Sequence, residues 1–480
     1  MSDVSDIPEW DLLVVGAGPA GLAATAEAQA RGLRVGVIDE QGRAGGQILR
    51  QPPRQFEVER WLPGRAYHAL KKLLADAERL SEVSWLLRVG VVGIFPAEPG
   101  RRGYGFHVIV ADSAGTHTLR ARRVLLATGC HELFPALPGW TLPGVMTAGA
   151  IQAFLKSQHY LIGNDIFFSG THPLQVLVAD QVLRAGGRVA GVAFAQPASS
   201  VMALLRHPAI FARHALRFAT VGAALARLRK AGVPVLFGHV TTSVEGHDRV
   251  TAVQVTPWNA ADGFTKQRVV RVECDALGLC FGFVPQSELA RQLGARAHWQ
   301  PRVGGWAVHH DEWMRSSIEG LYVAGEITGI GGAEIARSEG SLAAQGILLD
   351  AGRVTHAQAR AAARPLERKL RSLRKFARLL DELASPAEVL PQLVTPETIV
   401  CRCENITLGD LSRALEANRD ISTPRAAKLL TRAGMGWCQG RGCEHVIMRL
   451  TRVGYADPPA ESCGFTARFP ARPVRIGDLK

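Results

Sequence analysis

Short apolar runs alternate with helical patterns along residues 1–350. Residues 12–15 predict a buried parallel strand, residues 22–30 are Ala-rich and helical in pattern, and residues 35–38 predict a second strand. The same order returns at 165–194, where two further strands enclose a helix. Strands that alternate with helices favour parallel sheets covered by helices, so we expect an α/β fold with two nucleotide-fold units.

A glycine-rich turn joins the first strand to its helix. Gly16, Gly18 and Gly21 follow the strand directly, and Asp39 ends the second strand. In this pattern the first glycine permits a tight turn, the second lets backbone N–H groups approach a pyrophosphate, and the third lets the helix pack closely on the sheet. Asp39 would accept hydrogen bonds from a ribose hydroxyl. A glycine turn without a ligand is the alternative, but strand, helix and acid together favour a dinucleotide site.

Two later segments favour FAD over NAD as that dinucleotide. Residues 45–47, Gly-Gly-Gln, resemble the segment that two-dinucleotide-domain flavoproteins run along the flavin. Residues 320–326 resemble the strand that brings an acid to the ribityl chain, with Glu326 in place of the usual Asp. By this resemblance the FAD-binding residues are Gly16, Ala17, Gly18, Pro19, Ala20, Gly21, Asp39, Glu40, Gly46, Gln47, Val91, Ala127, Thr128, Gly129, Gly325, Glu326 and Ala333.

The second nucleotide-fold unit has an altered turn. His172 stands where the second glycine of the turn would let a pyrophosphate approach, and the next strand ends in Ala195 and Gln196. Neither the acid expected for NAD nor a basic residue for NADP is present at that strand end. We therefore expect this unit to keep its fold without binding nicotinamide, and we interpret His172 as a turn or packing residue. A structural adenine nucleotide, or FMN at this site or an interface, is a further hypothesis.

Four cysteines gather in the C-terminal part of the chain. Cys401 and Cys403 form a C-x-C pair, and Cys438 and Cys443 form a C-x4-C pair thirty-four residues later. Four thiolates suit either a [2Fe–2S] cluster or a structural zinc ion, but zinc ribbons usually space their cysteines as C-x-x-C. The pattern thus favours the iron–sulfur cluster. The other cysteines, which form no close pair and so argue against a dithiol reductase, are Cys130, Cys274, Cys280 and Cys463.

Composition narrows the class of protein. The chain of 480 residues carries a formal net charge of +13 that is spread along its length, with one concentration of arginine at 360–378. A solvated helix face is the simpler interpretation of that segment, and docking onto an acidic partner is the alternative. No nucleic-acid-binding motif accompanies the charge. The chain shows no signal peptide and no apolar run of about 18 residues, so we expect a cytoplasmic protein, or one that is peripheral at the inner membrane through its electron acceptor.

These patterns predict five parts. We expect an FAD-binding domain at 1–160 and 281–350, an inserted second nucleotide-fold domain at 161–280, and a charged helical connector at 351–396. A small helical [2Fe–2S] domain would follow at 397–463, and a tail at 464–480.

Motifs at both ends of the chain carry a close family resemblance. The segments GAGPAGLAA, DEQGRAGGQI, ATGCHE, GWTLPGVMTAGA and LYVAGEITGIGGAE resemble the larger, FAD-containing subunit of bacterial opine oxidases, hydrogen cyanide synthase and D-hydroxyproline dehydrogenase. The segments CRCE and GMGWCQGRGC resemble the cluster domain of bacterioferritin-associated ferredoxin. His172, Glu326 and Cys130 depart from the family pattern.

This resemblance implies an electron-transfer subunit. A partner similar to D-amino-acid or glycine oxidase would oxidise a C–N bond of an amino acid, imino acid or opine, and pass the electrons to FAD and the cluster here. The resemblance also implies two further partners, a downstream electron acceptor and a small ferredoxin-like subunit. No residue of this chain is then expected to be catalytic. The competing hypothesis is a self-sufficient NAD(P)H-dependent reductase that uses the cluster as its outlet.

Overall fold

A five-stranded parallel sheet forms the centre of the first domain in the computed structural model, which describes residues 9–56, 58, 67–97, 105–200, 206–265, 268–418, 423–451 and 464–478. The sheet has the order β22-β8-β2-β3-β4. Its strands are β2 (Leu12–Val15), β3 (Val35–Asp39), β4 (Ser84–Leu87), β8 (Val124–Leu126) and β22 (Leu321–Val323). Cys463 and residues 201–205 lie outside the described residues.

Alternate residues of β2 enter two different cores, because successive side chains of a strand point to opposite faces. Leu12 and Val14 belong to the core beneath α1 (Pro19–Gln29), α2 (His68–Glu78) and α8 (Ala333–Asp350). Leu13 and Val15 belong to a core shared with an antiparallel sheet. That second sheet has the order β1-β7-β6-β5 and consists of β1 (Glu9–Trp10), β5 (Gly90–Pro96), β6 (Phe106–Asp112) and β7 (Gly115–Ala121).

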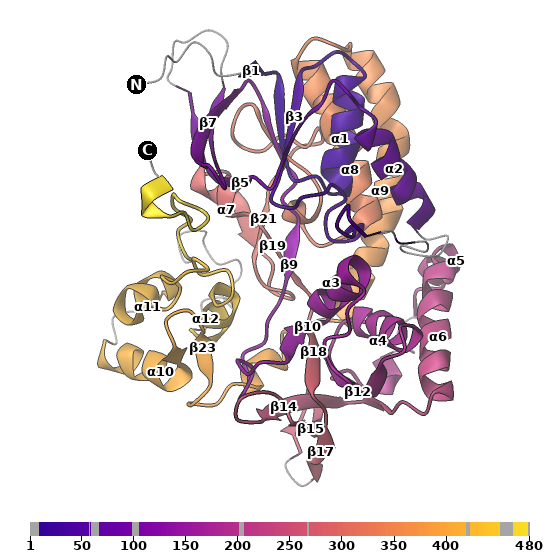
Figure 1. Ribbon diagram of the computed structural model, residues 1–480, viewed down its shortest axis with the longest axis vertical. Coiled ribbons are helices and arrows are strands. Elements are labelled where there is room, and N and C mark those ends of the chain that lie inside the picture. The colour runs from indigo at the N-terminus through magenta and orange to yellow at the C-terminus, as the bar shows by residue number, and fades with distance from the viewer. Residues whose placement is uncertain are drawn as a thin grey trace.

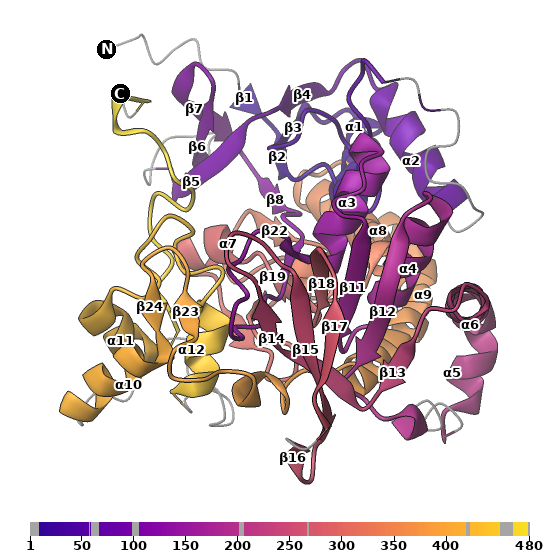
Figure 2. The ribbon, with the colours of Figure 1, turned by 60° about the horizontal axis from the view of Figure 1, so that its bottom comes forward.

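The second domain repeats the parallel architecture (Figure 2). Its sheet has the order β10-β18-β11-β12-β13, formed by β10 (Val145–Thr147), β11 (Asp165–Gly170), β12 (Arg188–Phe194), β13 (Val235–Phe237) and β18 (Ala276–Cys280). The helices of this domain are α3 (Ala148–Gln158), α4 (Leu174–Arg184), α5 (Pro208–Arg213) and α6 (Ala215–Lys230). A smaller antiparallel sheet joins β14 (His239–Glu245), β15 (Ala252–Asn259), β16 (Gly263–Phe264) and β17 (Val270–Glu273).

Two features of this domain were not given by the sequence pattern. Its sheet includes β10, which precedes the expected boundary of 161. Two helices, α5 and α6, lie within residues 208–230 and are separated at His214. The loop before β10 is rich in Pro and Gly, which hid a strand of three residues from the sequence pattern.

Short elements connect the two domains. The strand β9 (Cys130–Glu132) leaves the first domain and pairs with β19 (Phe283–Pro285), which returns to it. Beside them lie α7 (Glu288–Gln292) and a hairpin of β20 (Ala297–Trp299) with β21 (Trp306–Val308).

The predicted connector at 351–396 is part of the two main cores. Helix α9 (His356–Leu383) begins with a capping box at Thr355 and packs along α8. Its apolar stripe recurs every three or four residues, as one face of a helix requires, and comprises the buried Ala359, Ala363, Leu370 and Leu373 with the partly buried Leu366. Val389, Leu390 and Leu393 then enter the core of the second domain around a short helical turn, η6 (Leu390–Gln392). Many arginines on the other faces of α9 concealed this stripe.

The cysteine-rich domain lies against one flank of the molecule (Figure 1). It consists of β23 (Ile399–Cys401), β24 (Ile406–Thr407), α10 (Leu408–Ala417), α11 (Pro424–Thr431) and α12 (Glu444–Leu450). The predicted tail then runs back to the first domain, where Ala471 N–H donates to the Val92 carbonyl and the Thr116 hydroxyl donates to the Asp478 carbonyl. No helix among the described residues is long and apolar enough to cross a membrane.

Helices α1 and α8 approach so closely that only glycine fits at their crossing. A Cβ atom added to Gly340 would lie 2.0 Å from the Ala20 carbonyl oxygen. Because a backbone atom cannot move aside cheaply, we expect Gly340→Ala to destabilise the protein by about 2 kcal/mol, which a lower thermal unfolding midpoint would report. The control is Gly222→Ala in α6, where nothing lies within 4 Å. That substitution should leave the midpoint unchanged or raise it, and equal effects of the two would contradict the account.

Candidate functional site

The three glycines of the first turn meet different constraints. A Cβ atom on Gly16 would lie 2.3 Å from the Ala127 carbonyl oxygen, and one on Gly21 would lie 1.9 Å from the Gly16 carbonyl oxygen. The protein's own packing therefore requires both. A Cβ atom on Gly18 would have Gly46 Cα at 3.9 Å as its nearest neighbour, which is an ordinary contact. The packing of the protein therefore does not require glycine at position 18. The exposed backbone there leaves an open surface that a pyrophosphate could approach.

Asp39 is held by the backbone at the end of β3. Its carboxylate accepts hydrogen bonds from Ala17 N–H at 2.7 Å and from Gln41 N–H at 2.8 Å. Burial raises the pKa of Asp39 despite these two bonds. The side chain thus lies beside the glycine turn, where a ribose hydroxyl would be expected. The neighbouring Glu40 forms an ion pair with Arg472 of the tail at 2.8 Å, a contact that no local pattern indicated.

The segment at 45–47 packs directly on the glycine turn. Gly45 N–H donates to the Ala17 carbonyl at 2.8 Å, and a Cβ atom on Gly46 would lie 2.8 Å from Gly18 Cα. Gln47 accepts a hydrogen bond from the Arg50 guanidinium at 2.9 Å. Pro19 and Ala20 open α1 over the same turn.

Residues 127–130 follow β8, a strand of the first parallel sheet. Thr128 donates its hydroxyl hydrogen to the Gln286 carbonyl at 2.6 Å, and Gln286 N–H donates to the Gly129 carbonyl at 3.0 Å. Ala127 and Val91 are buried, with Val91 in the core between the two sheets of the first domain. Cys130 follows, and burial together with the negative charges of Glu326 and Glu132 raises the pKa of its thiol.

Glu326 is bonded to the loop that leads into α8. It accepts hydrogen bonds from Gly331 N–H at 3.2 Å and from Gly332 N–H at 2.7 Å, directly before Ala333. Burial raises the pKa of Glu326 to about 7. The sequence placed Glu326 at the ribityl chain, and the structure adds this attachment to its own loop.

A second acid near Gly325 was missed by sequence reasoning. The buried Glu339 accepts from Gly325 N–H and from the Thr328 hydroxyl, each at 2.9 Å, and pairs with Arg374 of α9 at 2.8 Å. Its position in the interior of α8 gave no signal, because the partners come from two other segments, residues 325–328 and α9.

In the second unit, residues of the turn itself occupy the space beside the backbone. A Cβ atom on Gly170 would lie 2.0 Å from the Cys280 carbonyl oxygen, so packing requires this glycine. His172 Nδ1 accepts from Leu174 N–H at 3.2 Å, and its ring meets Phe283 edge-on at 5.4 Å between centroids. Burial lowers the pKa of His172 to about 4. The prediction that His172 is a turn and packing residue is confirmed.

The four clustered cysteines form two pairs. Cys401 and Cys443 are buried. The Cys443 thiol donates to the Gly440 carbonyl at 3.8 Å, and Gly434 N–H donates to the Cys401 sulfur at 3.4 Å. The neighbouring Cys443 side chain, together with this N–H, lowers the pKa of Cys401 to about 6. Cys403 is exposed and pairs with the half-buried Cys438. Four thiolates in two pairs suit a two-iron centre, with two thiolates for each iron.

The loop between Cys438 and Cys443 is shaped by an aromatic residue of the tail. Cβ atoms on Gly434 and Gly440 would lie 2.3 Å and 2.6 Å from the ring of Phe465. Lys428 lies over the same ring, with its ammonium 5.0 Å from the centroid. The absence of a side chain at both glycines therefore makes room for the ring of Phe465.

A buried carboxylate fastens the cysteine domain to the first domain. Glu444 accepts two hydrogen bonds from Arg291, both at 3.2 Å, one from Trp306 Nε1 at 3.0 Å and one from Phe465 N–H at 2.8 Å. The Arg291 guanidinium lies 5.1 Å from the Trp306 ring centroid. Because Glu444 directly follows Cys443, this network fixes the cysteine loop against the body of the protein.

A second contact joins the two candidate sites. His131 Nε2–H donates to the Arg441 carbonyl at 3.2 Å, and Arg441 lies between Cys438 and Cys443. His131 itself follows Gly129 and Cys130 on β9. The flavin turn and the cysteine loop are therefore connected through one short strand and one hydrogen bond.

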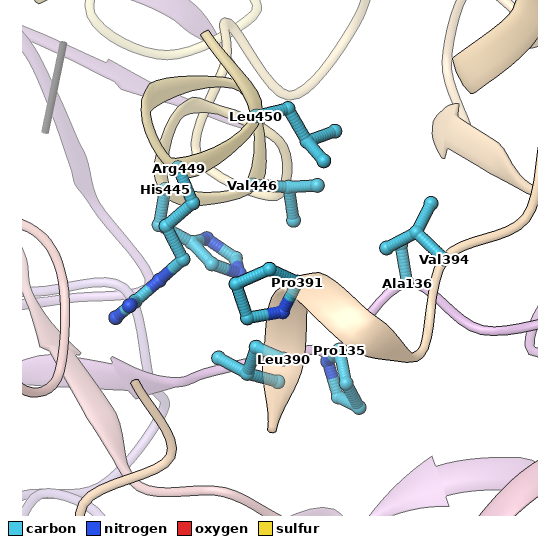
Figure 3. A pocket seen from close by; sticks show the side chains of 9 residues that line it. All are labelled: Pro135, Ala136, Leu390, Pro391, Val394, His445, Val446, Arg449 and Leu450. Carbon is cyan, nitrogen blue, oxygen red and sulfur yellow. The ribbon is translucent and has the colours of Figure 1, made fainter. Parts of the chain in front are cut away.

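Two small cavities lie along this interface. One of about 20 Å³ is lined by His131, Glu288, Arg441 and Glu444, among others, and has room for a water molecule. The other, of about 10 Å³, lies where His445 and Val446 of α12 face Leu390, Pro391 and Pro135 (Figure 3). Neither could hold an organic ligand, so both are packing features of the interface.

The two sites together define a flavin- and iron–sulfur-dependent oxidoreductase. Residues 10–343 match the pyridine nucleotide-disulphide oxidoreductase family, and residues 399–451 match the BFD-like [2Fe-2S] binding domain. The predicted cofactors, FAD and a [2Fe–2S] cluster, and the predicted class of FAD-dependent oxidoreductase are thereby confirmed.

Full-length relatives narrow the family further. The chain is 35% identical to the A subunit of opine oxidase from Rhizobium meliloti (strain 1021), over 98% of each chain. It is 33% identical to the HcnB subunit of hydrogen cyanide synthase from Pseudomonas aeruginosa, over 96% of each chain. The chain therefore belongs to the family of HcnB and the opine oxidase A subunit, as its motifs predicted.

Solved structures support the fold. L-proline dehydrogenase from P. horikoshii superposes with a TM-score of 0.69 at 20% identity, and the match covers 98% of this chain and 80% of that one. Thioredoxin reductase of T. acidophilum gives 0.52 at 19% identity, over 72% of this chain and 99% of that one. The predicted two-dinucleotide-domain fold with a C-terminal cluster domain is confirmed.

The substitution Gly18→Ala tests whether Gly18 is needed for FAD binding and not for folding. Gly18 has an ordinary backbone conformation, with φ of −78°, and space for a methyl group. We expect the apoprotein to keep its thermal unfolding midpoint, while a methyl group in the path of the pyrophosphate weakens FAD binding at least tenfold, by about 1.4 kcal/mol. Titration of apoprotein with FAD measures this, with Gly222→Ala as the matched control. Unchanged FAD affinity would remove Gly18 from the site.

Glu444→Gln tests the fastening of the cysteine domain. The substitution leaves Arg291 buried without an anion, which costs about 2–3 kcal/mol. We expect a lower thermal unfolding midpoint than in Glu416→Gln, which changes an exposed carboxylate of α10. A midpoint equal to that of the control would show that the network does not hold the domain.

Proposed function

We propose that this chain is the electron-transfer subunit of a multi-subunit dehydrogenase or oxidase that oxidises a C–N bond of an amino acid, imino acid or opine. The substrate would be oxidised on a partner protein resembling D-amino-acid or glycine oxidase, and a small ferredoxin-like subunit would complete the assembly. The relatives named as subunits of opine oxidase and hydrogen cyanide synthase support this assignment. So does the alpha subunit of sarcosine oxidase from Corynebacterium sp. (strain P-1), which is 28% identical over 69% of this chain and 31% of its own length.

The observation that carries the proposal is the contact between His131 and the Arg441 carbonyl. It links the strand that leaves the flavin turn to the loop between two cysteines of the cluster domain. When bound, FAD accepts an electron pair and the [2Fe–2S] cluster passes electrons on singly. The chain's own residues serve to hold the two groups at a fixed separation, with Arg291 and Glu444 as the clamp.

Specific residues would hold each cofactor. Gly18 and Gly46 would present bare backbone to the FAD pyrophosphate, Asp39 would bind the ribose, and Glu326 would lie at the ribityl end beside the start of α8. The cluster ligands in this proposal are Cys401, Cys403, Cys438 and Cys443. The buried pair, Cys401 and Cys443, and the more exposed pair, Cys403 and Cys438, would hold the cluster together.

A self-sufficient NAD(P)H-dependent reductase is the second candidate, favoured by the match to the pyridine nucleotide-disulphide oxidoreductase family. His172 argues against it, because its buried ring fills the turn of the second unit. Cys130, Cys274 and Cys280 form no closely spaced pair in the sequence, so they do not supply the C-x-x-C dithiol of a disulfide reductase.

Anaerobic reduction of the purified chain decides between the two. We expect NADH and NADPH to leave the flavin absorbance unchanged, and dithionite to bleach it, because the electrons come from a partner protein. In Cys438→Ser the cluster absorbance should be lost while FAD remains bound. The control Cys274→Ser changes a buried thiol of the second domain and should keep both cofactors. Rapid bleaching by either nicotinamide nucleotide would replace the electron-transfer assignment with the reductase.

A further inference from the structure

The two cysteine pairs differ in their exposure to solvent. Cys401 and Cys443 are buried on the side of α12, which faces the body of the protein through Glu444 and His445. Cys403 is exposed and Cys438 is half-buried. In both views α12 lies next to the body, whereas α10 and α11 lie on the outside (Figures 1 and 2). The cluster site therefore has an inner edge, in contact with the flavin domain, and an outer edge, open to solvent.

Large apolar side chains accompany the outer edge. Trp437 precedes Cys438 directly and is 79% exposed, and Leu429 and Leu430 at the end of α11 are 67% and 42% exposed. Single exposed apolar residues are common on protein surfaces and need no explanation. Trp437 is different, because a large aromatic side chain is exposed directly beside a proposed cluster ligand, together with two exposed leucines. Trp is also the residue type most enriched at the centres of protein interfaces. We name these three residues and Cys403 the outer patch.

The backbone around the outer patch is held in an uncommon conformation. Asn405, Arg432 and Gln439 have positive φ of 54°, 66° and 54°. Such residues cost free energy and persist where the surrounding structure fixes them, often at functional sites. Here the constraint is the packing of Gly434 and Gly440 on Phe465, which presents Trp437 outward on a fixed loop.

The charges beside the outer patch are mainly positive. Residues 402–405 and 425–439 contain Arg402, Arg425, Lys428 and Arg432, with Glu404 as the single acid. The Glu404 carboxylate is already paired with Arg432 at 2.8 Å. Arg402 and Arg425 are exposed. A partner that covers Trp437 would meet a basic rim, so electrostatic complementarity requires an acidic surface on that partner.

We propose that the outer patch is the docking surface for an acidic one-electron carrier protein, which receives the electrons that leave this chain. The inference rests on the proposed function and names the surface and charge of its electron acceptor. Each encounter transfers one electron from the reduced cluster to an oxidised carrier. Two encounters discharge the electron pair of one substrate molecule, and the protons leave the flavin for solvent. Trp437 and Leu429 would be covered in the complex, and Arg402 would lie at its rim.

The test uses the full holoprotein reduced with stoichiometric dithionite, so it needs no substrate-oxidising partner. An acidic b-type cytochrome is mixed with the reduced chain, and the second-order rate of cytochrome reduction is followed as a function of ionic strength. We expect the rate to fall as salt is added, because opposite charges steer the encounter. A basic c-type cytochrome should react more slowly at low salt and faster as salt is added.

Three variants and one control locate the contact. Trp437→Ser, Leu429→Ser and Arg402→Glu should each lower the rate with the acidic cytochrome tenfold or more, and Arg402→Glu should also flatten its salt dependence. Reduction of p-benzoquinone, a small neutral acceptor, should be unchanged in all three. The control Leu216→Ser alters a side chain of α6 that is 78% exposed and distant in sequence from the patch, and should react as the wild type does.

Two results would overturn the inference. One is wild-type rates with the acidic cytochrome in the three variants while the cluster absorbance is intact. The other is a faster reaction with the basic cytochrome at low salt. If Trp437→Ser lowers the cluster content, the rate of Leu429→Ser decides the outcome, because Leu429 lies farther from the ligands in the sequence. A failure of the proposed function would appear elsewhere, as bleaching of the flavin by NADH or NADPH.

Discussion

Glu444 follows Cys443 directly and accepts hydrogen bonds from Arg291 on α7, Trp306 on β21 and Phe465 of the tail. The carboxylate is largely buried, and its charge is matched by a guanidinium that is itself buried against an indole ring. A buried ion pair contributes little to stability on balance, but it tolerates only one geometry, since removing either partner leaves an unpaired charge. This pair therefore sets where the cysteine loop lies relative to β9. The link between His131 and Arg441, and with it the spacing of the two cofactors, depends on that position.

The motif glycines illustrate how one sequence pattern can have several physical origins. Gly16 and Gly21 are required by backbone contacts within the first domain, and Gly170 is required in the same way in the second domain. Of the three glycines in the first turn, Gly18 alone has room for a side chain. The glycine at this position is therefore explained by a ligand that approaches the backbone, and not by internal packing. In the second unit the equivalent position is His172, which fills the turn. In the second unit the glycine that packing requires, Gly170, is still present. The position at which a phosphate would approach is occupied by His172.

The sequence pattern predicted those elements that are determined by residues close together in the sequence. The strand, turn and helix at 12–29 repeat at 165–184 in the structure. The spacing of the four cysteines did not predict their pairing, because each pair joins one cysteine of the C-x-C motif to one of the C-x4-C motif. Contacts across long sequence separations could not be predicted in this way. Arg291 gave no sign of binding Glu444, and Glu339 gave none of supporting Gly325, because each partner lies on a different element. Helix α9 was interpreted as a connector because its many arginines outweighed its apolar stripe.

The path of residues 464–478 has a consequence for the order in which the protein matures. Phe465 closes over Gly434 and Gly440, and Arg472 reaches Glu40 on the first sheet. These residues follow the cysteine domain in the chain and leave the ribosome after it, so the inner side of the cysteine loop cannot be sealed while the domain itself is being made. Until Phe465 packs there, the core that encloses Cys401 and Cys443 lacks one of its members. Burial of these two cysteines is therefore completed by a segment that is synthesised after them.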